Sequence, residues 1–197
     1  MNMVLQVDVA GTPQEWLHPE DAATILCNGN VAWTHGRTVM TLHGGWNRIG
    51  DRSTLDIPAI IATKGMAKNN LASGVPSLTN PKLFARDRFM CAYCGDVFPT
   101  KELNREHIHP VSRGGQDIWM NVVTTCRHCN WQKGSMTLEE SGLSLLYLPY
   151  EPNWFENFLL RRGGKVILAD QMEFLMGRLP SQSRMLENPD EYFSIIH

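Results

Sequence analysis

The chain has 197 residues, of which 43% are hydrophobic and 19% charged, and its formal net charge is −2. This composition supports a packed core in one domain or two small ones and excludes a chain that is disordered throughout. No stretch approaches the roughly 18 apolar residues of a transmembrane helix. Because the N-terminus also lacks a basic segment followed by an apolar one, we expect a cytoplasmic protein that does not contact membranes.

The first 75 residues predict a small α+β unit. Apolar residues alternate with polar or small ones from Met3 to Val9, which is typical of a strand. A short helix is expected from Pro19 to Leu26, with acidic residues in its first turn and Asn28-Gly29 after its end. The sequence does not indicate what this unit does.

Further strands are expected in this unit at residues 31–33, 37–42 and 55–62. The first two flank an expected turn at His35-Gly36. Pro58 lacks a backbone N–H, so it restricts the last strand to a sheet edge or to a bulge.

The middle of the chain begins after residues 63–81, whose Gly, Asn, Ser and Pro content is typical of a linker. A short helix is expected at residues 83–87. Residues 82–133 hold eight Lys and Arg against five Asp and Glu, a net charge of +3 in a chain whose total is −2. A locally basic segment is weakly indicative of a surface that meets phosphates.

Four of the five cysteines form two Cys-x-x-Cys pairs, separated by 31 residues: Cys91 with Cys94, and Cys126 with Cys129. Two such pairs supply the four thiolates that a tetrahedral zinc ion requires. A site made only of thiolates has no open coordination position, so we expect this zinc to be structural. A redox role is the alternative, but it does not explain two pairs.

The residues between and after these pairs resemble the HNH endonuclease family, which has the ββα-metal fold. Residues 103–134 contain an acidic residue followed by His, then Pro, a Ser-Arg-Gly-Gly loop, an Asn before an apolar strand, and Cys-x-x-Cys-Asn running into Lys-Gly. The resemblance implies an α+β fold, in which the N-terminal unit precedes an HNH domain at residues 82–142 with structural zinc.

The resemblance implies a role for each matching residue. Glu106 takes the place of an acidic metal ligand, more often Asp in the family, and His107 takes the place of the general base. Asn130 takes the place of the second ligand of the catalytic metal. Asn121 corresponds to a residue that holds a loop and does not touch substrate.

These residue types suit the hydrolysis of a phosphodiester. A neutral histidine accepts a proton from water near neutral pH, and carboxylate and amide oxygens suit a catalytic Mg²⁺ or Mn²⁺ ion. Arg113 and Lys133 are expected to neutralise flanking phosphates. His109 is either a ligand or phosphate contact or a structural residue. Trp119 and Trp131 are expected to pack in the small core.

The remaining residues, 143–197, are expected to form a mostly helical C-terminal extension, with a helix near residues 166–179. The resemblance implies a metal-dependent endonuclease acting on DNA, with double-stranded DNA as the expected partner. A single site cleaves one strand, so double-strand cleavage requires a homodimer or two successive events. The alternative is a non-catalytic zinc module that binds nucleic acid or protein.

Overall fold

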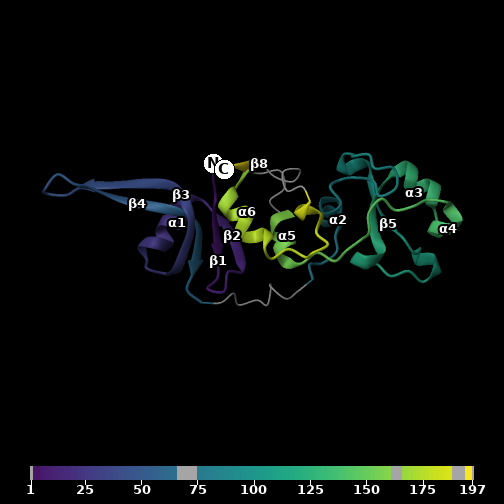
Figure 1. The fold of residues 1–197 in the computed structure, drawn as a ribbon, viewed down its shortest axis with the longest axis horizontal. Coiled ribbons are helices and arrows are strands. Elements are labelled where there is room, and N and C mark those ends of the chain that lie inside the picture. Colours follow the sequence, from purple (N-terminus) through teal and green to yellow (C-terminus); the bar gives the residue numbers. More distant parts are fainter. Residues whose placement is uncertain (1, 66–74, 161–165, 188–193, 197) are drawn as a thin grey trace. The chain divides into compact units, whose positions relative to one another are not determined.

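The computed structural model describes residues 2–65, 75–160, 166–187 and 194–196 (Figure 1). Two compact units make up the chain. The first unit comprises residues 1–73, 164–179 and 193–197, and the second comprises residues 74–163 and 180–192. Residues after 142 thus divide between the two units. Within the described ranges, no helix is long and apolar enough to cross a membrane.

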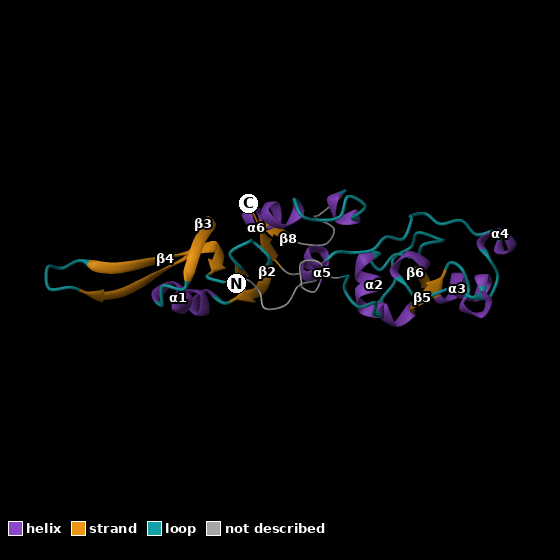
Figure 2. Cartoon of the chain, turned by 90° about the horizontal axis from the view of Figure 1, so that it is seen from below, coloured by secondary structure: helices purple, strands orange, loops and turns teal. Residues whose placement is uncertain are grey.

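The first unit is built on a four-stranded sheet with the order β2-β1-β4-β3. Figure 2 draws strands as orange arrows. Its strands are β1 (Val4–Val7), β2 (Pro13–Leu17), β3 (Val31–Trp46) and β4 (Arg52–Thr63). Strands β1 and β4 are parallel, and the other neighbours are antiparallel. Helix α1 (Pro19–Cys27) packs its buried alanines against the core. The buried centre of this core is formed by Val4, Ala22, Ala23, Ile57 and Ile61.

The strand predicted at residues 3–9 and the helix predicted at 19–26 are confirmed, but the prediction of a turn at His35-Gly36 is wrong. Strand β3 continues through these residues. Gly36 has a φ of +83°, and the pairing register shifts between His35 and Thr38, so the glycine makes a bulge within the strand. Pro58 pairs with Thr38 beside this bulge, which accommodates its missing N–H in a strand that lies inside the sheet.

Residues near the C-terminus complete the first unit. Strand β7 (Val166–Leu168) pairs in parallel with β8 (Ser194–Ile196), and helix α6 (Ala169–Met176) follows β7. The helix expected over residues 166–179 is therefore shorter, because its first three residues form a strand. Gln171 of α6 donates hydrogen bonds to the carbonyls of Met3 and Ala59, at 2.8 Å each. These bonds fasten α6 to the four-stranded sheet.

The second unit contains a two-stranded antiparallel sheet followed by a helix: β5 (Leu103–His107), β6 (Val122–Cys126) and α3 (Arg127–Lys133). Helix α2 (Asn80–Arg86) precedes them, as expected from the sequence, and α4 (Leu138–Ser141) and α5 (Trp154–Leu160) follow. Part of the expected linker, residues 66–74, lies outside the described residues. The buried core is formed by Leu83, Phe84, Leu103, Trp119 and Val122.

A buried arginine organises this unit. Arg86 is fully buried and pairs with Asp87, with Nε and Oδ1 2.8 Å apart. Its guanidinium also donates to the carbonyls of Trp119, Val122 and Tyr150, while Asp87 accepts a hydrogen bond from the backbone of Thr124. Because these groups lie on three separate segments, the pair fixes where β6 runs, and α3 follows directly from β6.

Candidate active site

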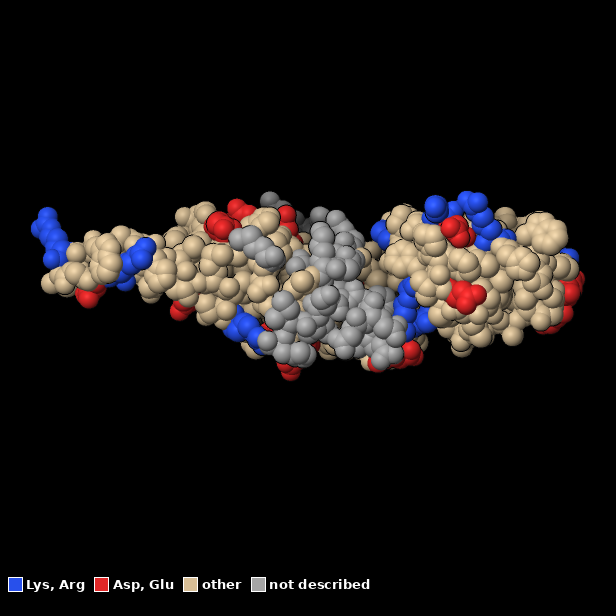
Figure 3. Space-filling model, turned by 90° about the horizontal axis from the view of Figure 1, so that it is seen from above, with Lys and Arg blue, Asp and Glu red and all other residues tan. Residues whose placement is uncertain are grey.

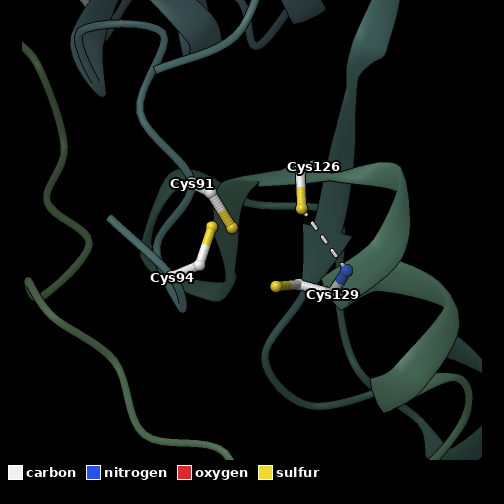
Figure 4. Close-up of side chains that lie close together, drawn as sticks. All are labelled: Cys91, Cys94, Cys126 and Cys129. Atoms are coloured by element: carbon white, nitrogen blue, oxygen red, sulfur yellow. Dashed lines mark hydrogen bonds between the residues drawn. The ribbon is translucent and has the colours of Figure 1, made fainter. Parts of the chain in front are cut away.

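The four paired cysteines converge in the second unit (Figure 4). Their sulfur atoms all lie within 4.8 Å of one another. Cys91 and Cys94 lie in a tight turn that Gly95 closes with a φ of +82°. Cys126 ends β6 and caps α3, where its Sγ accepts a hydrogen bond from the backbone N–H of Cys129.

The electrostatics of the cluster favour a bound cation. Burial, together with the interaction with Cys91, raises the pKa of Cys94 to about 11. Burial also raises the pKa of Cys129, as do its cysteine neighbours. Four adjacent thiolates without a cation are therefore unfavourable, whereas a divalent ion stabilises them. The donor set and its compactness fit a tetrahedral zinc ion.

Glu106 and Lys133 form a buried ion pair between β5 and α3. Lys133 Nζ lies 2.7 Å from Glu106 Oε1 and donates a second bond, of 2.8 Å, to the carbonyl of His107. The Lys133 side chain is 0% exposed and that of Glu106 is 9% exposed. Burial raises the pKa of Glu106, and the hydrogen bond from Lys133 opposes that rise. Lys133 thus faces a carboxylate in the interior and does not present its ammonium to solvent, where phosphates would lie.

His107, at the end of β5, contacts a residue that the sequence interpretation missed. Its Nε2 lies 2.9 Å from Oδ1 of Asp117, whose other oxygen accepts a 2.6 Å bond from Arg105. Burial opposes ionisation of Asp117, but hydrogen bonds from Arg105 and then His107 outweigh it and lower its pKa. Asp117 is ten residues from His107 in the sequence, and only the course of the intervening loop brings them together.

That loop is held by Asn121. Its side-chain oxygen accepts from the backbone N–H of His109 at 2.9 Å, and its amide donates to the carbonyls of His109 and Gln116. Gly115 permits the close approach, because a Cβ there would lie 1.9 Å from the carbonyl oxygen of His109. These contacts have the geometry of a loop-holding residue.

Two other predicted site residues make local contacts. His109 Nε2 lies 2.9 Å from the carbonyl oxygen of Arg113, and since a carbonyl only accepts, this nitrogen is the donor. The Arg113 guanidinium is 2.8 Å from the Glu140 carboxylate, and each of the two side chains is about half exposed. Arg113 therefore remains at the surface, next to an acidic partner.

Asn130 lies on α3, one turn before Lys133. Side chains three residues apart share a helix face, so Asn130 is on the side of α3 that meets β5 at Glu106. Its backbone carbonyl accepts a bond from Gly134. An open cavity of about 220 Å³ lies beside this region. It is lined by Glu106, His107, Pro110, Val111, Ser112, Gly134 and Ser135.

Trp119 and Trp131, two of the tryptophans of this unit, differ in their exposure. Trp119 is 4% exposed and packs in the core, as expected, and its indole donates to the carbonyl of Pro76. The prediction for Trp131 is wrong, since this residue is 83% exposed. It lies two residues after the buried Cys129, about 200° around the helix, and so faces away from the core.

Residues 91–146 match the model of a protein family described as HNH endonuclease. The resemblance inferred from the sequence is thereby confirmed over these residues. No curated protein matches the chain. The matched segment contains all four cysteines, the loop held by Asn121 and the cavity beside His107.

Proposed function

Because residues 91–146 match the HNH endonuclease family, we propose that the protein is a metal-dependent endonuclease that hydrolyses phosphodiester bonds in double-stranded DNA. The observation that supports this best is the open cavity that both the buried Glu106 and His107 line. The cavity thus brings a proton acceptor, His107, and a metal-binding oxygen, that of Glu106, to the place where one phosphate would bind.

His107 is the proposed general base. In the tautomer in which Nε2–H donates to Asp117, Nδ1 carries a free lone pair. A water molecule next to Nδ1 loses a proton to it as the water oxygen attacks phosphorus. Asp117 is a positioning residue in this scheme, because its carboxylate selects the tautomer and fixes the ring orientation.

Glu106 and Asn130 are the proposed ligands of the catalytic ion. Both offer hard oxygen donors, as Mg²⁺ and Mn²⁺ prefer, and Lys133 contacts only one of the two carboxylate oxygens. When bound, such an ion neutralises charge on the phosphate and stabilises the leaving 3′ oxygen. The hydrogen bond from Lys133 opposes the rise in the pKa of Glu106 that burial causes, and it fixes the position of one carboxylate oxygen.

A non-catalytic zinc module is the second candidate. The buried Lys133–Glu106 pair favours it, since an ammonium already neutralises the carboxylate that a catalytic ion would use. The two candidates make opposite predictions about the metal dependence of DNA cleavage.

A plasmid-cleavage assay distinguishes them. Purified protein is incubated with supercoiled plasmid while Mg²⁺ or Mn²⁺ is added or omitted, alongside Asn130→Ala and the matched control Gln132→Ala from the exposed side of the same helix. We expect metal-dependent nicking that Asn130→Ala abolishes and Gln132→Ala retains. A zinc-loaded protein that leaves plasmid intact with either ion contradicts the nuclease.

A further inference from the structure

The outer half of the β3–β4 hairpin is a two-stranded ribbon without a core. Residues 43–54, called the ribbon tip below, are all exposed. By contrast, Ile57 and Ile61 further along β4 are buried. Exposure on both faces means that the tip covers nothing in the first unit, and an isolated two-stranded ribbon gains little stability from such an extension.

The loop at the end of the tip is pre-ordered. The side-chain oxygen of Asn47 accepts from the backbone N–H groups of Ile49 at 3.0 Å and Asp51 at 2.8 Å. The backbones of Asn47 and Asp51 are bonded as well. This network fixes Arg48 and Ile49 at the outermost turn, where Ile49 is 85% exposed.

Arginine and apolar side chains gather on the tip. Arg52 lies over the ring of Trp46 at 6.0 Å from its centroid, and Trp46 is 72% exposed. The tip carries two arginines and a single acid, Asp51, whose carboxylate lies 3.4 Å from the Asn47 amide. Figure 3 shows basic side chains at the outer end of this hairpin.

The tip is also slender. Strand β3 has no side chains at Gly44 and Gly45, and a Cβ at Gly44 would lie 2.2 Å from Ser53 Oγ on the facing strand. A two-stranded ribbon fits the major groove of duplex DNA. Proteins that bind the minor groove use arginine and frequently insert an apolar side chain such as isoleucine between base steps.

From this combination we propose that the ribbon tip is a second DNA-binding element that enters a groove of the duplex. Arg48 and Arg52 contact the backbone phosphates, and Ile49 and Trp46 make apolar contacts within the groove. The inference rests on the proposed function, in that duplex DNA is the substrate. It assigns to the first unit a role in holding that substrate.

The test measures binding separately from cleavage. Fluorescence anisotropy with a labelled DNA duplex, without added divalent ion, gives the Kd and its salt dependence for the full chain. The variants are Arg48→Ala, Arg48→Ala with Arg52→Ala, and Ile49→Ala. Lys64→Ala is the matched control, since it removes one exposed positive charge just beyond the opposite end of β4.

We expect the double arginine variant to raise Kd at least tenfold and to reduce the slope of log K against log salt by about 0.9 for each phosphate that is no longer neutralised. Ile49→Ala raises Kd without changing that slope, and Lys64→Ala changes neither. Tip variants that bind the duplex as wild type does overturn the proposal, even when plasmid cleavage upholds the nuclease. A tip required for self-association in sedimentation, but not for DNA binding, also overturns it.

Discussion

Lys133 and Glu106 are 27 residues apart in the sequence but form one ion pair in the fold. The ammonium is fully buried and is bonded to the carboxylate and to the carbonyl of His107. From the sequence, Lys133 was expected to neutralise a flanking phosphate. The direction of the Lys133 side chain is determined by the packing of α3 on β5, which is distant in the sequence, so the residues around Lys133 do not predict it.

Replacing Lys133 leaves a buried, unpaired carboxylate. Lys133→Met should lower the free energy of unfolding of the second unit by about 3 kcal/mol, because removal of one partner of a buried pair strands the other charge. Urea denaturation measures this loss. The double variant Lys133→Met, Glu106→Gln should recover most of it, and a single variant as stable as wild type argues against the pair.

Asp117 should affect catalysis more than binding. In Asp117→Asn the amide no longer selects the His107 tautomer, so we expect cleavage to slow about ten- to a hundredfold, part of what a general base contributes. The lowered pKa of Asp117 keeps the carboxylate ionised at neutral pH, so the wild-type interaction weakens only in acid. Single-turnover rates measure the effect. Glu140→Gln, which alters another arginine-paired carboxylate, is the control and should keep wild-type kinetics. Wild-type kinetics in Asp117→Asn would contradict the proposed role of Asp117.

At the scale of elements, the sequence predicted the parts with local signals. The alternation at residues 3–9 and the acidic first turn of α1 are local, and both elements are observed. The Cys-x-x-Cys spacing likewise indicated the four-cysteine cluster. The single long strand β3 was missed because His35-Gly36 has the composition of a turn, and only pairing with β4 makes it a bulge. The contact of His107 with Asp117 depends on a loop and has no local signal.

Helix α5 carries a buried carboxylate that makes stability depend on pH. Glu156 is fully buried and accepts hydrogen bonds from Tyr150 at 2.5 Å and Ser183 at 2.6 Å. Burial raises its pKa, with these two hydrogen bonds opposing the rise. The folded state therefore holds the proton more tightly than the unfolded chain does. Its contribution to stability is complete below the unfolded pKa of about 4.3 and is lost as the pH rises through the folded pKa.

Glu156→Gln should remove this dependence, since the amide oxygen still accepts both bonds and carries no charge. We expect the variant to be more stable than wild type at about pH 8 and similar to it in mild acid. Urea midpoints at several pH values measure the difference. Glu151→Gln, at an exposed carboxylate five residues earlier, is the control. If the stability of Glu156→Gln changes with pH as that of the wild type does, Glu156 is not the source of the pH dependence.

At the scale of the whole molecule, the two units have separate cores. The first packs α1 on its sheet, and the second gathers α2, β5 and β6 around Trp119 and the cysteine cluster. Within the part of the chain that the structure describes, the second unit holds the four-cysteine cluster, where the binding energy of a metal ion would be folding energy. The family match falls within the second unit, so the sequence indicated the chemistry there and left the first unit without a role.

Removing zinc should therefore unfold one unit and spare the other. In Cys129→Ser, or after chelation of the wild type, we expect loss of the near-ultraviolet signal of the buried Trp119 and retention of the β-sheet signal of the first unit. Near- and far-ultraviolet circular dichroism measures the two signals, and the zinc content is determined on the same sample. A zinc-free protein with an unchanged second unit contradicts the structural role of the metal.

The most direct test of the central claim is the plasmid-cleavage rate of His107→Ala against wild type, at equal zinc content and equal duplex affinity. The proposed mechanism predicts a loss of about 10²- to 10⁴-fold, the usual contribution of a general base. A variant that folds, binds duplex DNA and cleaves at the wild-type rate would contradict the assignment of His107, and with it the active site described above.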